Sequence, residues 1–332
     1  MTGPAALPLV IAHRGASGYR PEHTLAAYEL AIELGADAIE PDIVASKDGV
    51  LVLRHENDIS VTTDVAGHPE FAGRRTTKSI DGVSLTGWFT EDFTWDELRT
   101  LRARERLAKV RPGNAKHPEQ PLLRLADLIA LLDGADRAVG LVAELKHASY
   151  FGAIGLPLDR LLTDELWATG WNDDPRLTVE SFETTVLGRL RERGLNGDSV
   201  FLLEADGSPA DGAETGGVAM LYSDYLTDSG LAALAGTVDG ISVNKRLLLS
   251  TDSAGNAVDV TDLVDRAHAV GLSVFCWTLR AENRFLPRNF RRGASRNAFG
   301  DWMGEFQLIM RSGVDGVFAD QPDLALQARA AL

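Results

Sequence analysis

The sequence predicts an α/β protein of the (β/α)₈ TIM-barrel class, with a capping insertion after the second strand. Short strand-like runs alternate along the chain with amphipathic stretches of helical period, which is the pattern of repeated βαβ units. Eight such runs occur in 332 residues, and that number favours a closed barrel over an open sheet. With 45% hydrophobic residues the chain can bury a substantial core, so we treat residues 1–332 as one domain.

The strands and helices are expected in regular succession. The predicted strands are LVIAH (9–13), AIEPDI (38–43), LVAELK (141–146), LTVESF (177–182), VFLLE (200–204), GISVN (240–244), SVFCW (273–277) and GVFAD (316–320). Helical patterns follow most of them, at 23–34, 124–133, 184–193, 260–270 and 302–312. Thr24 is placed to cap the first helix.

Three segments fall outside this repeat. The run VLVLRH (50–55) follows an Asp48-Gly49 pair, which is a hairpin signal, so we expect it to pair antiparallel with an extension of the second strand. That pairing would return His55 to the barrel mouth. Residues from about 56 to 121 lack barrel periodicity and predict an insertion that caps the mouth. A smaller, locally basic insertion is expected at about 281–301.

Composition excludes several classes of protein. The formal net charge is −15, from 33 Lys and Arg against 48 Asp and Glu, which is the wrong sign for a general nucleic-acid binder. Cys276 is the single cysteine, so the chain cannot form an intrachain disulfide. No apolar run approaches the ~18 residues of a membrane span, and we expect no stable membrane insertion. The N-terminal stretch lacks signal-peptide features, which predicts a cytoplasmic protein, or a secreted one if a leader has been removed.

Acidic residues gather at the predicted strand ends, where a barrel carries its active site. Glu40 and Asp42 are spaced i, i+2, as are Glu144 and Lys146, and this spacing puts both side chains on one face of a strand. Three inward-facing acids exceed what one lysine balances, so Glu40, Asp42 and Glu144 are candidate ligands of a hard divalent cation, Ca²⁺ or Mg²⁺. Glu180 is a candidate to support this cluster.

Two histidines and two cations complete the predicted site. His13 and His55 each end an apolar run that should point into the mouth, and imidazole exchanges protons near neutral pH. Arg14 and Lys146 bring fixed positive charge suited to phosphate oxygens. This set of groups indicates phosphoryl-transfer chemistry.

Ordered motifs along the chain resemble those of the glycerophosphodiester phosphodiesterase family. They are HRGASGYRPEHT, GADAIEPDIVASKDGVLVLRHE, AELK, SFE, WTL and GVDGVFADQPD. The segments TTDVAGHPEFAGRRTTKSIDG, TGWFTEDFTWDEL and LRAENRFLP are similar to the long bacterial branch of that family. The resemblance implies a metal-dependent TIM barrel that hydrolyses deacylated phospholipids, such as glycerophosphocholine or glycerophosphoethanolamine, to sn-glycerol 3-phosphate and an alcohol.

The resemblance also implies roles for individual residues. It makes His13 and His55 the general acid/base pair, Glu40, Asp42 and Glu144 the metal ligands, Arg14 and Lys146 the phosphate contacts, and Glu22 and Trp277 neighbours of the substrate. The nucleophile is either water or the adjacent glycerol hydroxyl, and the resemblance favours the hydroxyl and a cyclic phosphate. Two departures from the common pattern, His55-Glu56 for His-Asp and EHT (22–24) for Glu-Asn-Thr, concern the subfamily.

Other functions remain possible at this level. A phospholipase or lysophospholipase D-like enzyme would need an apolar or basic membrane-facing rim, which the net charge of −15 does not favour. A hydrolase of glycerol-phosphate polymers such as teichoic acid would use the insertions as a groove, and a catalytically dead barrel would serve as a scaffold. The alcohol group, the choice of cation, the oligomeric state and the role of Glu204 stay open.

Overall fold

The computed structural model describes residues 7–213 and 220–332. The first six residues of the stretch considered above for a signal peptide lie outside this range. No helix in the described part of the chain has the length and apolarity needed to span a bilayer.

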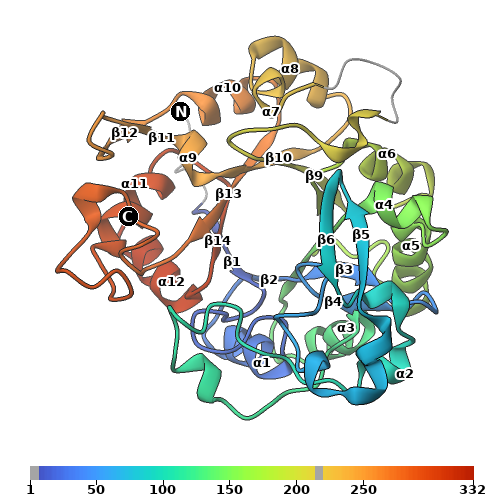
Figure 1. The fold of residues 1–332 in the computed structure, drawn as a ribbon. Helices are drawn as coiled ribbons and strands as arrows, with labels where there is room; N and C mark the ends of the chain where they lie inside the picture. The colour runs from blue at the N-terminus through green and yellow to red at the C-terminus, as the bar shows by residue number, and fades with distance from the viewer. Residues whose placement is uncertain (1–6, 214–219) are drawn as a thin grey trace.

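Eight parallel strands close into a barrel, which confirms the predicted fold class (Figure 1). They are β1 (Leu9–His13), β2 (Ala38–Glu40), β7 (Gly140–Leu145), β8 (Leu177–Ser181), β9 (Asp198–Leu203), β10 (Gly240–Asn244), β13 (Ser273–Leu279) and β14 (Gly316–Ala319). Each strand pairs in parallel with the next, and pairing of β14 with β1 completes the ring. The predicted strand runs therefore match the observed strands to within a few residues.

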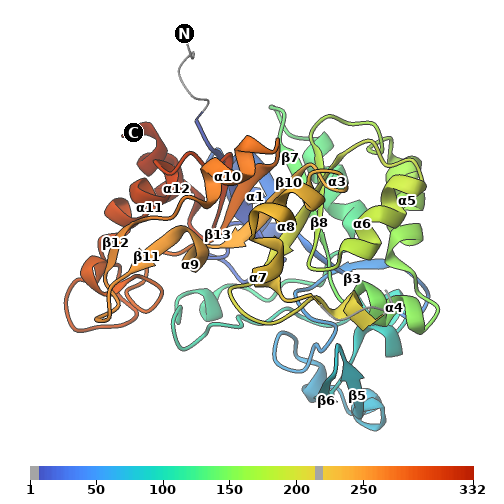
Figure 2. The ribbon, with the colours of Figure 1, turned by 90° about the horizontal axis from the view of Figure 1, so that it is seen from above.

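Helices surround the barrel and bury one face each against it (Figure 2). The longer ones are α1 (Leu25–Glu33), α3 (Leu125–Asp133), α5 (Leu158–Thr169), α6 (Thr184–Glu192), α8 (Asp228–Leu234), α10 (Leu263–Ala269), α11 (Trp302–Met310) and α12 (Pro322–Ala330). Shorter ones are α2 (Trp95–Leu98), α4 (Ala148–Ala153), α7 (Tyr222–Tyr225) and α9 (Lys245–Leu248). Thr24 caps α1 as predicted, because its side chain accepts a hydrogen bond from the Ala27 amide.

The second predicted strand divides at Pro41. Proline has no amide proton for a ladder, so β2 ends at Glu40 and a new strand, β3 (Asp42–Ala45), begins beyond it. β3 pairs antiparallel with β4 (Leu51–Leu53) across the Asp48-Gly49 turn, which confirms the predicted hairpin. His55 follows β4 by two residues and reaches the barrel mouth, where it lines the cavity described below.

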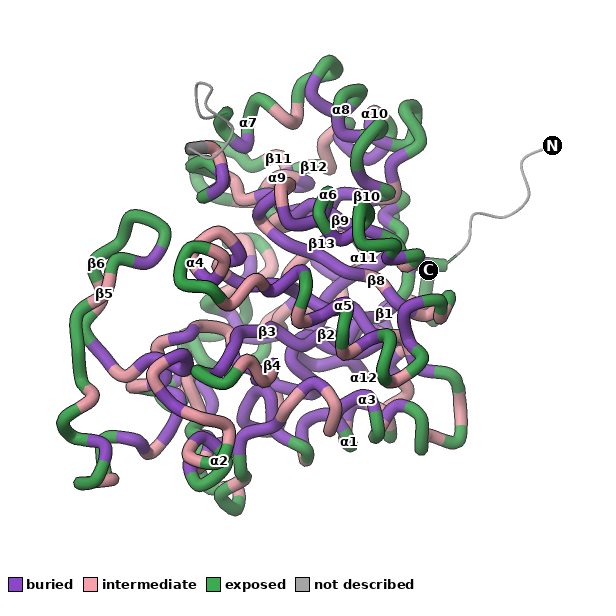
Figure 3. Tube along the Cα trace, turned by 90° about the vertical axis from the view of Figure 1, so that its right-hand side faces the viewer, coloured by how far each residue is buried: buried purple, intermediate pink, exposed green. Residues whose placement is uncertain are grey.

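Two further hairpins lie outside the barrel. β5 (Thr76–Ile80) and β6 (Val83–Gly87) pair antiparallel within the segment 56–121, and β11 (Leu249–Thr251) pairs with β12 (Ala257–Val260). The sequence did not predict either pair. The β5–β6 hairpin extends from the body of the molecule on the side where α4 follows β7, as Figures 2 and 3 both show. We call residues 76–87 the cap hairpin.

The core lies mainly between the strands and the surrounding helices, and buried residues accordingly concentrate in the centre of Figure 3. A smaller apolar layer fills the barrel interior; it consists of Ile11, Ala38, Val142 and Phe318, with Phe275 and Trp277 packed on it. Because this layer plugs the barrel, the space at the carboxyl ends of the strands is open to one side only. That space holds the candidate site.

Candidate active site

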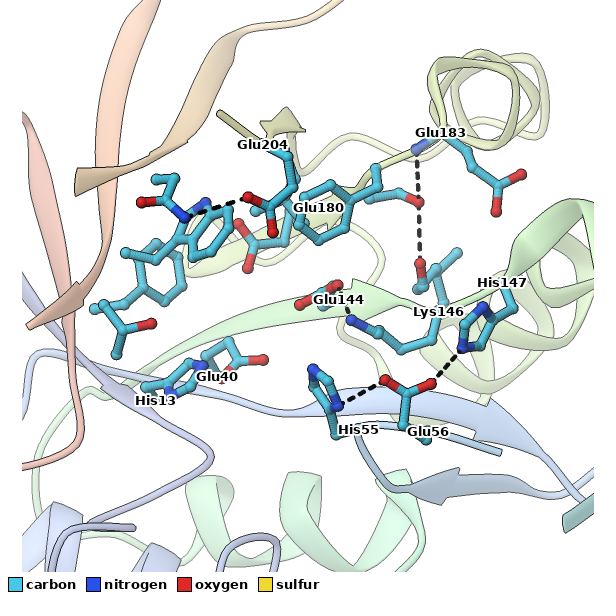
Figure 4. Close-up of a pocket in the computed structure, with 18 of the residues that line it drawn as sticks. His13, Glu40, His55, Glu56, Glu144, Lys146, His147, Glu180, Glu183 and Glu204 are labelled. Atoms are coloured by element: carbon cyan, nitrogen blue, oxygen red, sulfur yellow. Dashed lines mark hydrogen bonds and ion pairs between the residues drawn. The ribbon is translucent and has the colours of Figure 1, made fainter. Parts of the chain in front are cut away.

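A cavity of about 970 Å³ lies at the carboxyl ends of the barrel strands (Figure 4). Every barrel strand, or the residue just after it, contributes to the lining, through His13, Glu40, Glu144, Glu180, Leu202, Asn244, Trp277 and Phe318. Seven of the nine predicted site residues line this cavity: His13, Arg14, Glu40, His55, Glu144, Lys146 and Trp277. Asp42 and Glu22 are not among the lining residues and lie behind Arg14, which contacts both.

His13 ends β1 and is held by a buried carboxylate. Its Nδ1 lies 2.7 Å from Oδ1 of Asp320, which follows β14, the neighbour of β1 in the barrel. Since an ionised carboxylate only accepts hydrogen bonds, Nδ1 carries the proton and Nε2 is the free nitrogen of the neutral ring. Burial, together with the positive charge of Arg14, lowers the pKa of His13 to about 3, although Asp320 opposes this shift. His13 is therefore a neutral imidazole at physiological pH.

His55, which follows β4, also has its Nδ1 beside a carboxylate. Its Nδ1 lies 2.9 Å from Oε1 of Glu56, the next residue in the chain. Burial and the positive charges of Arg14 and Lys146 lower the pKa of His55 to about 4. Both rings thus present one free nitrogen, and Figure 4 shows them at the mouth beside Glu40 and Glu144.

Arg14 projects into the cavity from a sharp turn. Its φ of 59° and that of Gly15, 82°, are both in the left-handed region, and a Cβ on Gly15 would lie 2.7 Å from the Ala27 carbonyl carbon, so only glycine fits. The guanidinium contacts Oδ2 of Asp42 at 3.0 Å and Oε2 of Glu22 at 3.2 Å. These carboxylates fix its direction toward the cavity.

Three buried carboxylates at the floor of the cavity form the best candidate metal centre in the described residues. Glu40, Glu144 and Glu180, from three consecutive barrel strands, each offer an oxygen within 4.8 Å of the other two. Oε1 of Glu40, Oε2 of Glu180 and Oδ1 of Asp42 are buried without a hydrogen-bond partner. Hard divalent cations take such oxygens as ligands, so the donor set fits Ca²⁺ or Mg²⁺.

The electrostatics of this cluster show the same surplus of acid. Burial raises the pKa of Glu144 to about 8, with Lys146 opposing and Asp42 adding to the shift. Burial and the charge on Asp42 also raise the pKa of Glu40 well above its usual range. Although burial acts against it, the cations Arg14 and Lys146 hold the pKa of Asp42 well below its usual range. Without a cation the protein therefore keeps protons on this cluster at neutral pH.

The structure adds Glu180 to the predicted acids and turns one oxygen of Asp42 away from Glu40. The i, i+2 rule puts Glu40 and Asp42 side by side, but Pro41 breaks the strand between them. Oδ2 of Asp42 instead faces Arg14 and His23, the latter at 2.9 Å, while Glu180 completes the close triad. Asp42 keeps one oxygen directed toward the cluster, 3.7 Å from Nζ of Lys146.

Glu22, predicted to lie near the substrate, is paired with two arginines. Its carboxylate accepts hydrogen bonds from Arg14 and from Nε and Nη2 of Arg106, both at 2.9 Å to the nearer oxygen. These two arginines occupy the carboxylate, so it supports Arg14 from behind. Arg106 itself belongs to the segment 56–121 and lines the cavity.

Two aromatic side chains of the cavity lie beside the charged groups. Phe182 and Trp277 meet edge to face, with ring centroids 5.8 Å apart, and Nζ of Lys146 lies 5.4 Å from the centre of the Phe182 ring. Nε1 of Trp277 donates to the Ser242 carbonyl, which fixes the indole. The cavity therefore offers an apolar surface suited to a carbon chain next to its charged groups.

A model of the glycerophosphoryl diester phosphodiesterase family matches residues 13–324, nearly the whole chain. The chain belongs to this family.

Curated relatives of the chain cover most of its length. A glycerophosphodiester phosphodiesterase of Arabidopsis thaliana is 33% identical over 328 residues, which cover 94% of this chain and 83% of the relative. A probable glycerophosphodiester phosphodiesterase of Mycobacterium tuberculosis is 29% identical over 274 residues, 82% of each chain.

Solved structures share the fold of this family member. A putative glycerophosphoryl diester phosphodiesterase from Silicibacter pomeroyi has a TM-score of 0.69 at 22% identity and covers 99% of this chain and 95% of its own. A phosphodiesterase from Oleispira antarctica, solved in complex with the product sn-glycerol-3-phosphate, has a TM-score of 0.64 at 21% identity, with 97% and 96% covered.

The sequence assigns no role to several residues at the site of this family member. Asp320 ends the strand run GVFAD and Glu56 follows His55, so position alone could have indicated both. Asp81 lies in an Asp-Gly pair, the same hairpin signal that located the β3–β4 turn. His147 follows the AELK motif and carried no signal.

Proposed function

We propose that the protein hydrolyses glycerophosphodiesters to sn-glycerol 3-phosphate and an alcohol. The observation that carries the proposal is a pair of neutral histidines, His13 and His55, each oriented by a carboxylate and sharing one cavity with two cations and a buried acid cluster. The names of the relatives support this choice of substrate.

In the proposed reaction the two histidines exchange protons with the substrate. The free Nε2 of one ring takes the proton of the attacking hydroxyl. The other ring binds a proton at its Nε2 when the anionic phosphate lies beside it, and it delivers this proton to the departing alkoxide oxygen as the P–O bond breaks. Asp320 and Glu56 stabilise the imidazolium that forms on His13 and on His55. The same pair of rings serves attack by water and attack by the adjacent glycerol hydroxyl followed by opening of a cyclic phosphate.

The cation is proposed to be Ca²⁺, with Mg²⁺ as the alternative, held by Glu40, Asp42 and Glu144. Glu180 joins these ligands because it completes the close triad. A bound divalent cation would neutralise the carboxylates and polarise nonbridging phosphate oxygens. Arg14 and Lys146 contact the same phosphate from the protein side, and Trp277 packs against the glycerol carbons.

The domain organisation proposed from sequence accompanies this function. We infer that residues of about 56–121 cap the mouth of a single barrel domain, since Arg106 from this segment lines the cavity. The segment at about 281–301 is a smaller insertion beside the mouth.

An activity panel tests the proposal. Chelator-treated enzyme is assayed on glycerophosphocholine and glycerophosphoethanolamine after addition of Ca²⁺, Mg²⁺ or Mn²⁺, and lysophospholipid vesicles and a glycerol-phosphate polymer serve as rival substrates. We expect release of sn-glycerol 3-phosphate from the small diesters, dependent on one of the cations. Turnover of vesicles or polymer alone, or of no diester with any cation, would overturn it. Trapping a cyclic glycerophosphate decides the route of attack.

A further inference from the structure

The cap hairpin ends in a turn that reaches the catalytic side of the barrel. Asp81 and Gly82, at the turn between β5 and β6, both have positive φ, 46° and 81°, as a two-residue type I′ turn requires. Most residues of the hairpin are exposed, and Ile80 is its buried apolar residue. Its flank is tied to its own segment, because Nζ of Lys78 lies 2.8 Å from Glu91 and from Asp92. The turn itself is held by a different contact.

That contact is the first link in a series of hydrogen bonds and ion-pair contacts that leads to His55. Oδ2 of Asp81 lies 2.5 Å from Nδ1 of His147, and Nε2 of His147 lies 2.9 Å from Oε2 of Glu56. The other oxygen of Glu56 receives Nδ1 of His55 at 2.9 Å. Figure 4 shows the last two links, from His147 through Glu56 to His55, as dashed lines in one row. Both oxygens of Glu56 are therefore fixed.

The backbone of His147 is shaped for this bridge. It follows Lys146 at the end of β7 and adopts φ 53° and ψ 41°, a left-handed conformation that costs a non-glycine residue free energy. This conformation lets consecutive residues serve different partners, since Lys146 bonds Glu144 in the acid cluster while His147 bonds Glu56. Such a conformation at a strand end of the barrel indicates a functional constraint.

The hydrogen-bond partners of His147 determine its protonation state. A carboxylate has only acceptor atoms, so His147, which lies between the carboxylates of Asp81 and Glu56, donates from both ring nitrogens and is a cation. Burial lowers the pKa of His147, but the hydrogen bonds to Asp81 and Glu56 outweigh it and raise that pKa to about 9. Lys146 is the other cation beside Glu56. With one oxygen bound to an imidazolium, Glu56 accepts from Nδ1 of His55 and leaves Nε2 free for the substrate.

We propose that Asp81, His147 and Glu56 form a positioning relay that couples the cap hairpin to the catalytic histidine His55. Asp81 and His147 touch no reacting atom; they hold Glu56, and Glu56 sets the tautomer and direction of the ring. The inference rests on the proposed function, which makes His55 an acid/base. It assigns the cap hairpin a part in turnover beyond covering the mouth.

Kinetics of Asp81→Asn, His147→Gln and the double variant test the relay. Glycerophosphocholine is the substrate, at saturating cation, and thermal unfolding of each variant is recorded alongside. Each single variant should lower kcat about 10-fold or more while KM changes less than about threefold, because the ring is misplaced but the phosphate contacts remain. The double variant should lose no more than His147→Gln alone, since both changes break one chain. Thr77→Ala, an exposed change on the same hairpin, should behave as wild type.

Two kinetic outcomes would overturn the relay. One is additive loss in the double variant, which would indicate independent structural effects of the two residues. The other is wild-type kcat in both single variants, which would show that His55 needs no support from the hairpin.

A measurement on cation-free protein separates this inference from the proposed function. The chain has 7 histidines, so ¹⁵N spectra of the rings can be assigned by single substitutions. At pH 7.5 His147 should show two protonated nitrogens and His55 a protonated Nδ1, and Asp81→Asn should return His147 to a neutral ring. A neutral His147 in the unsubstituted protein would contradict the relay whether or not the protein is active on any diester.

Discussion

Replacing Glu144 by Gln should change the stability of the protein in opposite directions without and with a divalent cation. In the cation-free protein at pH 7 the folded state keeps a proton on Glu144, whose pKa burial raises to about 8, while the unfolded chain releases it from a group with a pKa of 4.5. Release favours the unfolded state, so this group destabilises the fold increasingly as pH rises from 4.5 toward 8. Glutamine resembles the protonated carboxyl and can keep the contact with Lys146.

The size of the effect follows from the same values. At pH 7, which is about 2.5 units above the unfolded-state pKa of 4.5, Glu144 destabilises the fold by about 3 kcal/mol, at roughly 1.4 kcal/mol for each pH unit. This is the largest gain in stability that Glu144→Gln can give. An unfolding entropy of roughly 2 cal/mol/K per residue gives about 0.7 kcal/mol/K for 332 residues. The variant should therefore melt up to about 4 °C above the wild type in chelator. A cation at about 100 times its Kd stabilises the wild type by roughly 2.7 kcal/mol, or about 4 °C, and the variant far less.

Differential scanning fluorimetry measures the Tm of both proteins in EDTA and in a Ca²⁺ or Mg²⁺ series, and urea denaturation checks the differences in stability. Glu204→Gln is the matched control, because Glu204 is a cavity carboxylate that bonds Asn244 and lies outside the close triad. It should leave both the cation-free Tm and the cation response near wild type. A Glu144→Gln variant that melts lower in EDTA and responds fully to the cation would refute the assignment of this cluster as a metal centre.

Other substitutions test the remaining assignments. His13→Ala and His55→Ala should each lower kcat at least 100-fold, as loss of a general acid/base does, while the cation-induced rise in Tm persists; near-normal turnover would exclude the role. Asp320→Asn should lower kcat about 10- to 100-fold and destabilise the fold by about 3 kcal/mol, because His13 loses its orienting partner and buried Arg111 a counter-ion; kinetics and urea denaturation measure the two losses. The pKa of His147 is about 9 in the folded protein against 6.5 in the unfolded chain, so its charge stabilises the fold fully below pH 6.5 and this stabilisation is lost as pH rises above about 9. The stability advantage over His147→Gln, about 3 kcal/mol at pH 6 at roughly 1.4 kcal/mol for each pH unit, should vanish at pH 10; an equal difference at both pH values would contradict the charged state.

The barrel could be predicted from sequence because its signals are local. Each strand is a short apolar run and each major helix has an apolar face, so counting them gives the closed barrel without knowledge of contacts. The β3–β4 hairpin was equally accessible through its Asp-Gly turn. The cap hairpin carries the same signal at Asp81-Gly82, but its strands are mostly exposed, so they lack the alternation of buried and polar residues that marks a strand.

The site was predictable to the extent that strand ends determine it. His13, Glu40 and Glu144 follow from the rule that barrel strands deliver their last residues to the mouth. The pairing of Glu22 with Arg106 does not follow from this rule, because Arg106 lies more than eighty positions away in a segment without periodicity. Likewise Glu180 could be placed at a strand end, but its closeness to Glu40 depends on how β8 and β2 are staggered in the closed barrel.

The segment 56–121 acts on the site at three separate points, always through a carboxylate. Arg111 bonds Asp320, which holds His13; Arg106 bonds Glu22, which holds Arg14; and the Asp81–His147–Glu56 relay holds His55. A cap that served only to cover the cavity would need no such connections. Because each oriented group lies in the cavity beside other charged groups, an unsupported ring or guanidinium would have several orientations of similar free energy, and the carboxylates select one. Loss of the cap contacts should therefore lower kcat before it lowers affinity for the cation, whose close triad comes entirely from the barrel strands β2, β7 and β8.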